Sequence, residues 1–330
     1  MLRKILIGLA VFIALIFVWN ASWRVSPPTD ATIELIAHRG VHQTFDNDGL
    51  GNDGCSAERI DPPRHGFFEN TLPSMRAAFA AGADIVELDI HPTTDGQLAV
   101  LHDWTLDCHT QASGVTREQT MAFLKTLDIA YGYTADGGKS FPFRGQGVGM
   151  MPELKEVLAA FPQGRFLVNF KSNEAREADL LAAAVAADPS WRDEVWGVYG
   201  GDPPTLRAQQ LLGLDNAWTR KSTIDCVLQY AGIGWTGYVP APCRNTRIML
   251  PINAAPWLWG WPNLFVQRMQ AAGSKVILLG AFEAGDPGTS GIDTLDDLAK
   301  VPVGFDGYIW TNRIEVIGPA LKGGEASPVL

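Results

Sequence analysis

Short apolar segments alternate with segments of helical periodicity along most of the chain after residue 33. This alternation predicts parallel strands joined by crossover helices. The predicted strands cover residues 33–37, 85–90, 165–171, 194–199, 216–219, 247–250, 275–279 and 307–310. About eight strands in this pattern favour a (β/α)₈ TIM barrel over residues 33–322, and a doubly wound open sheet is the alternative.

The segments between these strands predict the helices. The first begins after Thr71, a good N-cap, carries Pro73 in its first turn and ends at Gly82. Further helices are predicted at 116–124, 151–161, 178–187, 204–212, 263–272 and 295–300. Residues 41–68 are rich in Gly, Asp, Asn and Pro and show no period, so they predict a long loop after the first strand.

The N-terminus carries an uninterrupted apolar run from Ile5 to Trp19, preceded by Arg3 and Lys4. This pattern is typical of a secretory signal or a signal-anchor. The bulky Trp19 precedes Ala21 where a cleavage site would need a small residue, which favours an uncleaved membrane anchor over residues 1–23. A linker at 24–32 follows, and residues 323–330 form a tail. We expect export, with the barrel facing the periplasmic or extracellular side, and a cleaved secreted form is the alternative.

Cysteine number and overall charge limit the partners and the compartment. Cys55, Cys108, Cys226 and Cys243 are an even set in a chain predicted to be exported, so disulfides are favoured over free thiols. Three pairings are possible. Cys226 and Cys243 close a short glycine-rich loop, which favours a local disulfide and leaves Cys55 for Cys108. A net charge of -10 offers no basic field, so nucleic acid is not an expected partner.

The chemistry concentrates around the strand that contains Glu87 and Asp89. These carboxylates lie at i and i+2 in an apolar strand and therefore point to one face, where burial demands a counterion. The next strand runs into His102. This arrangement predicts a metal site with an acid or base beside it.

Other strand ends add complementary groups. The first strand ends at His38 and Arg39, and Asn169 and Lys171 share one face of a later strand. In a barrel these ends converge on the C-terminal mouth.

Several short motifs occur in a specific order: His38-Arg39-Gly40, Glu69-Asn70-Thr71, Glu87-x-Asp89, Asp95-Gly96 and His102-Asp103, with looser matches at Pro152-Glu153-Leu154, Asn169-x-Lys171 and Trp310-Thr311-Asn312-Arg313. The set resembles the glycerophosphodiester phosphodiesterase family. The resemblance implies a TIM barrel and metal-dependent hydrolysis of a glycerophosphodiester to glycerol 3-phosphate and an alcohol. It implies acid–base roles for His38 and His102, phosphate binding by Arg39 and Lys171, and one divalent cation, Mg²⁺ or Ca²⁺, on Glu87, Asp89 and Asn169, with Glu69 and Asn70 in support.

The chain departs from this family's pattern at three places. Asn169 replaces a third metal carboxylate, the loop at 41–68 is longer than usual and would narrow substrate choice, and Cys108 replaces a frequent arginine, which fits a disulfide to Cys55. Two other functions stay open. One is a phospholipase D-like cleavage of lysophospholipids near the membrane, and the other is a non-catalytic barrel that binds a phosphate ligand.

The neutral amide of Asn169 supplies less charge than a carboxylate, so we predict weak binding of divalent cations. Calorimetric titration of the pure protein with Mg²⁺ or Ca²⁺ tests this. Sub-micromolar affinity would contradict it.

Overall fold

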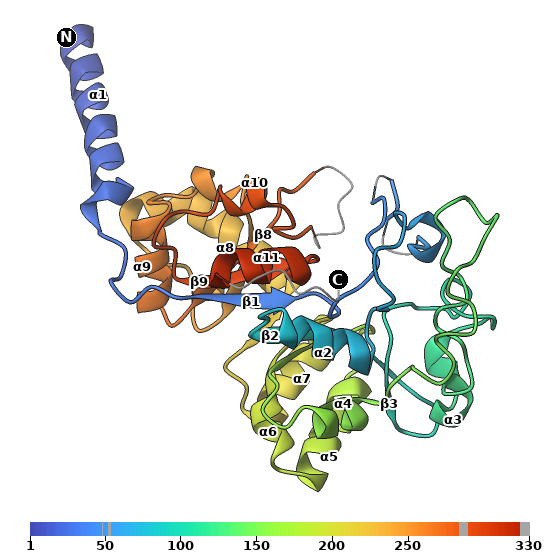
Figure 1. The fold of residues 1–330 in the computed structure, drawn as a ribbon. Coiled ribbons are helices and arrows are strands. Elements are labelled where there is room, and N and C mark those ends of the chain that lie inside the picture. The colour runs from blue at the N-terminus through green and yellow to red at the C-terminus, as the bar shows by residue number, and fades with distance from the viewer. Residues whose placement is uncertain (48, 52–53, 284–289, 324–330) are drawn as a thin grey trace.

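In the part of the chain that the structure describes, eight parallel strands form an inner layer that helices cover (Figure 1). The computed structural model describes residues 1–330 except 48, 52–53, 284–289 and 324–330. The strands lie in the order β6 (Ala217–Thr219), β5 (Val195–Gly200), β4 (Phe166–Phe170), β2 (Ile85–Pro92), β1 (Ile33–Ala37), β9 (Gly307–Thr311), β8 (Lys275–Leu279) and β7 (Arg247–Pro251). The end strands β6 and β7 contact each other, which gives a nearly closed barrel. The predicted TIM-type fold is confirmed.

Helices follow most of the strands and pack on the outside of the barrel. The described α-helices are α1 (Leu2–Trp19), α2 (Leu72–Ala80), α3 (Met121–Leu124), α4 (Leu154–Ala160), α5 (Arg176–Ala187), α6 (Trp191–Glu194), α7 (Asp202–Leu212), α8 (Arg220–Ile233), α9 (Asn263–Ala271), α10 (Leu295–Leu298) and α11 (Ile314–Lys322). Short 3₁₀ turns occur at η1 (Ser22–Arg24), η2 (Ala57–Arg59), η3 (Thr116–Glu118), η4 (Gly234–Thr236), η5 (Ala241–Cys243) and η6 (Ala255–Trp257).

The two-residue period of the strands decides which side chains enter the barrel. On β2, Ile85 belongs to the interior cluster, whereas Val86 and Leu88 pack toward the helices, so Glu87 and Asp89 share the inner face. The interior is filled by Ile36, Ile85, Leu167, Trp218, Ile277, Leu279, Tyr308 and Trp310. Polar side chains two or four positions further along β1, β2 and β4 therefore reach the C-terminal mouth.

A second hydrophobic core lies beside the mouth. Residues 41–68 pack against the segment that follows β3 (Leu98–Val100), a strand antiparallel to β2, and this part lies on the right in Figure 1. The cluster contains Ala57, Ile60, Phe68, Ala99, Leu101, Leu106, Met121, Leu124, Leu127, Ile129, Ala130, Tyr133, Phe143 and Met151. A disulfide between Cys55 and Cys108 joins its two segments. The predicted long loop is thus one half of an insertion with its own core.

Some predicted elements differ from the structure. The helix predicted at 116–124 is divided into η3 and α3, because Thr120 is extended and accepts a hydrogen bond from the Phe123 amide, which makes it an N-cap. The sequence did not predict α8, which has apolar residues on both its buried and its exposed faces. The predicted tail at 323–330 lies outside the described residues apart from Gly323.

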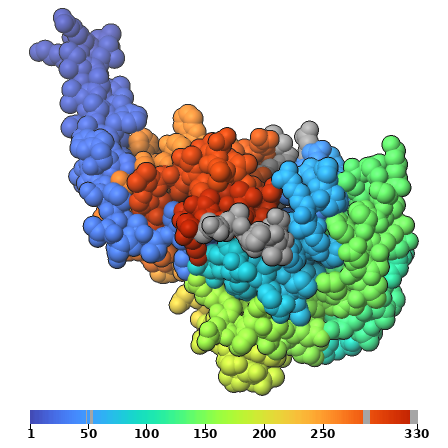
Figure 2. All heavy atoms as spheres, in the orientation of Figure 1, coloured from blue at the N-terminus to red at the C-terminus, as the bar shows by residue number. Residues whose placement is uncertain are grey.

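The N-terminal helix α1 projects from the rest of the molecule, which it contacts at its C-terminal end (Figure 2). It is 18 residues long and none of its residues is buried. By length and composition it is the one helix among the described residues that is long and apolar enough to cross a membrane.

Candidate active site

Two residues at the mouth have unusual backbone conformations. Arg39, which follows the end of β1, has φ 57°, and Asn70, which precedes α2, has φ 58°. Residues other than glycine rarely adopt this left-handed region, and such strain persists only where the surroundings fix it. Here the Arg39 amide donates to the Glu87 carbonyl at 3.1 Å, and the Asn70 amide donates to the Arg39 carbonyl at 3.0 Å. These contacts direct both side chains toward Asp89.

Asp89 is a fully buried carboxylate surrounded by donors. Burial raises its pKa, but the positive charges of Lys171 and Arg39 outweigh burial and lower it well below the ordinary value. Asn169 Nδ2 donates to Oδ1 at 2.9 Å and Asn70 Nδ2 donates to Oδ2 at 3.0 Å. Lys171 Nζ and Arg39 Nε form ion pairs with Oδ1 and Oδ2 at 3.5 and 3.3 Å. These charges favour the ionised form of Asp89.

Glu87 lies beside Asp89 but has weaker partners. Its Oε1 accepts from the Tyr199 hydroxyl at 2.7 Å, and its Oε2 accepts from the Arg39 amide at 3.2 Å and lies 3.8 Å from His38 Nε2. Burial, followed by the charge of Asp89, raises the pKa of Glu87 to about 8. The inner face of β2 is thus short of positive charge near Glu87.

This shortage fits a divalent cation. Two carboxylates that share a buried face offer the hard oxygens that Mg²⁺ and Ca²⁺ prefer, and a cation would stabilise the charged form of Glu87. Asn169 is adjacent, but its Nδ2 donates to Asp89 while its Oδ1 faces Gly200, where an added Cβ would lie 3.1 Å away. Asn169 would have to turn its amide to present the oxygen to a cation.

His38 is held as a neutral imidazole whose Nε2 accepts a hydrogen bond. Asn312 Nδ2 donates to Asp293, so its Oδ1 faces His38 Nδ1 at 2.6 Å and can only accept. The proton therefore sits on Nδ1 and leaves Nε2 as an acceptor, which receives the Arg39 Nε–H at 3.1 Å. Burial, followed by the charge of Arg39, lowers the pKa of His38 well below 6.5.

His102 has a different partner, the carboxylate of Asp103. Its Nδ1 lies 3.0 Å from Asp103 Oδ1, so Nδ1 carries the proton and Nε2 is left toward the mouth. Burial and the charges of Arg39 and Lys171 lower the pKa of His102, and the charge of Asp89 and the hydrogen bond to Asp103 oppose this shift. Of the two predicted catalytic histidines, His102 therefore has the surroundings that better support a proton.

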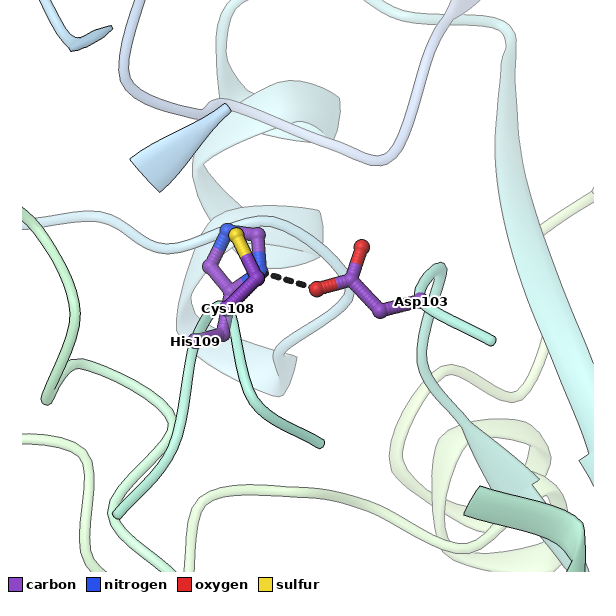
Figure 3. Close-up of side chains that lie close together, drawn as sticks. All are labelled: Asp103, Cys108 and His109. Carbon is purple, nitrogen blue, oxygen red and sulfur yellow. Dashed lines mark hydrogen bonds and ion pairs between the residues drawn. The ribbon is translucent and has the colours of Figure 1, made fainter. Parts of the chain in front are cut away.

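A second histidine shares Asp103 (Figure 3). His109 Nδ1 makes a short hydrogen bond to Asp103 Oδ2, and the His109 ring is buried. Burial lowers the pKa of His109, but the adjacent Asp103 carboxylate outweighs burial and raises it. Cys108 lies close by, but its sulfur is bonded to Cys55, so this trio offers no thiolate to a metal.

The backbone carbonyl of His109 is held by amides of a later segment of the chain. The amides of Tyr131 and Gly132 approach the His109 carbonyl at 3.1 and 3.4 Å. A Cβ at Gly132 would lie 1.8 Å from the Cys108 carbonyl oxygen, so only glycine fits there. This close approach and the disulfide fix the position of His109 relative to Asp103.

The predicted site residues come together at one rim. Glu69 binds Arg39 Nη1 through both carboxylate oxygens at 3.2 and 3.3 Å, and its carboxylate lies within 4.8 Å of the His102 and Asp103 ligand atoms. The set that gathers here is His38, Arg39, Glu69, Asn70, Glu87, Asp89, His102, Asn169 and Lys171. The predicted disulfide between Cys226 and Cys243 is present on the outside of the barrel.

The sequence did not assign roles to three further residues of the rim. Asn312 lies in one of the sequence motifs, but the motif does not predict its contact to His38. No sequence pattern predicts a role for His109, because its partner Asp103 lies across a turn of the chain. His42 lies 6.1 Å from His38 between ring centres and is also buried. Its Nε2 has no hydrogen-bond partner among the described residues.

Comparisons with known proteins agree with this geometry. The model of the glycerophosphoryl diester phosphodiesterase family matches residues 38–195. A glycerophosphodiester phosphodiesterase of Caldanaerobacter subterraneus subsp. tengcongensis is 36% identical over 103 residues, which is 31% of this chain and 39% of the relative. The lysophospholipase D GDPD1 of Mus musculus is 24% identical over 228 residues, which is 66% of this chain and 65% of the relative. The matches thus span less than two thirds of these relatives.

A solved structure has the same fold. The glycerophosphoryl diester phosphodiesterase domain of a Mycobacterium tuberculosis protein superposes with a TM-score of 0.61 at 17% identity. The superposition covers 86% of this chain and 96% of that domain.

The raised pKa of His109 predicts a pH-dependent contribution to stability. A group with a raised folded-state pKa stabilises fully below its unfolded pKa, and this contribution disappears as pH rises through the folded pKa. We therefore expect His109→Gln to lower the free energy of unfolding more at about pH 6 than at about pH 9. Urea denaturation at both pH values measures the difference.

His65→Gln is the control, because burial lowers the pKa of that half-buried histidine and gives the opposite sign. A loss of stability from His109→Gln that is equal at the two pH values would contradict the ion pair with Asp103.

Proposed function

We propose that this chain, whose residues 38–195 match the model of the glycerophosphoryl diester phosphodiesterase family, hydrolyses a glycerophosphodiester to glycerol 3-phosphate and an alcohol. The observation that carries this proposal is a pair of buried histidines at one rim with different partners, a neutral amide oxygen for His38 and a carboxylate for His102. The unprotonated Nε2 of His38 accepts a hydrogen bond from Arg39, His102 is paired with the Asp103 carboxylate, and the charges of Arg39 and Lys171 act on His102. A phosphodiester needs a proton acceptor, a proton donor and positive charge in this arrangement.

His38 would act as the base. Its Nε2 would take a proton from the water whose oxygen forms the new P–O bond, while Nδ1–H stays on Asn312, so the imidazolium that forms keeps a fixed orientation. His102 would act as the acid. Once His102 is protonated in the substrate complex, its Nε2 would give that proton to the alcohol oxygen as the P–O bond to this oxygen breaks, and Asp103 stabilises the charged ring.

Arg39 and Lys171 would bind the phosphate oxygens. Both now contact Asp89, and the Lys171 side chain is 20% exposed, so it is accessible from the mouth. A bound phosphate brings negative charge close to these cations and weakens their effect on His102, which raises its pKa in the complex. Substrate binding would thus prepare the acid.

A divalent cation on Glu87 and Asp89, with Asn169 as a neutral third ligand, would supply charge neutralisation and polarisation of the phosphate. Glu69 holds the Arg39 guanidinium, and Asn70 donates to Asp89, so both act as positioning residues. The choice between Mg²⁺ and Ca²⁺ depends on ligand number and geometry.

We also propose that the protein is exported and anchored through residues 1–23, with 24–32 as the linker, 33–322 as the barrel and 323–330 as the tail. The apolar helix α1 and the two disulfides support this assignment. The barrel would then work at the periplasmic or extracellular face of a membrane.

A second substrate class is a lysophospholipid. Its support is the similarity to the mouse lysophospholipase D over two thirds of this chain, together with a membrane helix that would hold the barrel near lipid. The same histidines and cations would serve a diester with an acylated glycerol.

Exchange of either histidine tests the mechanism. We expect His38→Gln and His102→Gln each to lower kcat/KM by about 10²- to 10⁴-fold, because each removes one proton transfer. The assay uses the full chain in detergent with glycerophosphocholine, glycerophosphoethanolamine and lysophosphatidylcholine, with and without EDTA.

His65→Gln is the matched control, since its ring contacts Gln43 and Phe67 on the long loop, and we expect it to keep full activity. Wild-type turnover of lysophosphatidylcholine without turnover of glycerophosphocholine would favour the second substrate class. No turnover of any of these diesters by the wild type would favour a binding barrel.

A further inference from the structure

The outer face of α8 and the segment after it expose apolar side chains. Leu228 is 67% exposed and Ile224, one turn earlier, is 45% exposed. The patch continues through Ile233, Trp235 and Tyr238, which are 43%, 37% and 52% exposed. The sequence from residue 226 to residue 243 contains no charged side chain. We call this surface the α8 face.

The α8 face is unusual for the outside of a barrel. Helices that cover a barrel bury one apolar stripe and present polar residues to water. The buried stripe of α8 contains Cys226 and Tyr230, so Leu228 and Ile224 are not needed for the core. An exposed apolar patch with a polar rim usually marks an interaction site. Charged residues at its ends form such a rim: the exposed cations Arg220, Lys221 and Arg244, of which Lys221 is paired with Asp225.

The end of α1 is fixed to the same region. Asn20 is buried, and its Nδ2 donates to the Trp235 carbonyl at 2.9 Å. Its Oδ1 accepts from Arg268 at 2.8 Å, and the Phe17 ring lies 5.9 Å from the Trp259 ring. Trp257, two residues before Trp259, is 84% exposed. The helix that would enter the membrane therefore leaves the barrel beside the α8 face.

We propose that the α8 face, together with Trp257, lies in the headgroup layer of the membrane that α1 enters. This inference rests on the proposed anchoring by α1. Tryptophan and tyrosine favour the membrane interface because each ring combines an apolar body with a polar tip. The rim cations would meet the lipid phosphates, in the manner of an amphipathic helix that lies on a bilayer.

This placement fixes the orientation of the barrel. Helices of a TIM barrel run alongside its strands, so a barrel resting on α8 has its axis along the membrane surface. The mouth then opens sideways at the level of the headgroups, where water-soluble diesters reach it.

Photocrosslinking of the full chain tests the contact. p-Benzoylphenylalanine replaces Leu228 on the α8 face, Leu206 on α7 or Leu9 in α1, in separate preparations in vesicles of phosphatidylcholine and phosphatidylglycerol. Leu206 is the matched control, a 51% exposed leucine on the neighbouring barrel helix. All three side chains are exposed, so the substitutions leave the core intact.

We expect lipid adducts at positions 9 and 228, with several-fold less at 206. Adducts at 9 with none at 228, or equal yields at 228 and 206, would overturn this inference alone. No adducts at either 9 or 228 would overturn the anchoring and this inference with it. Crosslinks from 228 to a second copy of the chain in place of lipid would show a protein interface and also overturn it. Hydrolysis is assayed on the same preparations, so a failure of the proposed activity is recorded separately.

Discussion

The burial of Glu87 and Asp89 side by side is the constraint on which the mouth of this barrel depends. Both point inward from β2, where an uncompensated charge costs several kcal/mol. Neighbouring strands therefore end in donors, Arg39 after β1 and Lys171 after β4, and β5 contributes the Tyr199 hydroxyl. Removal of one partner of a buried ion pair typically costs about 3–5 kcal/mol, so these residues are linked in stability as well as in function.

The negative charges of Asp89 and Glu87 are compensated to different extents. Asp89 is surrounded by two cations and two amides, whereas Glu87 has a hydroxyl and a backbone amide, and its pKa is raised to about 8. The protein thus holds one carboxylate in a site that favours an additional positive charge. This imbalance connects the fold to the proposed chemistry, because a cation at Glu87 would lie beside the Arg39 and Lys171 side chains that would hold the phosphate.

Much of this arrangement follows from the sequence alone. Carboxylates at i and i+2 in an apolar strand must share a face, and Asn169 and Lys171 obey the same rule on β4. The parallel strands bring their C-terminal ends together, so His38 and Lys171 meet although more than a hundred residues separate them. The local period of side chains was therefore enough to predict the fold and to bring the candidate residues to one rim.

Other features depend on contacts that no local pattern records. His109 reaches Asp103 because a turn, a disulfide and the close approach of Gly132 bring it there. The amide of Asn169 presents its nitrogen to Asp89 because the carboxylate needs a donor, although the residue type alone suggested an oxygen ligand. The helix α8 lacks a single apolar face, so the periodicity that predicted other helices gave no signal there.

The central claim is that Glu87 and Asp89 hold a divalent cation with a neutral third ligand at Asn169. The most direct test is calorimetric titration of Asn169→Asp with Mg²⁺ and Ca²⁺, because this change adds one negative charge at nearly constant shape. The account predicts that affinity increases roughly tenfold over the wild type, as a third carboxylate joins the ligand set. Unchanged or weaker affinity in a folded variant would contradict it.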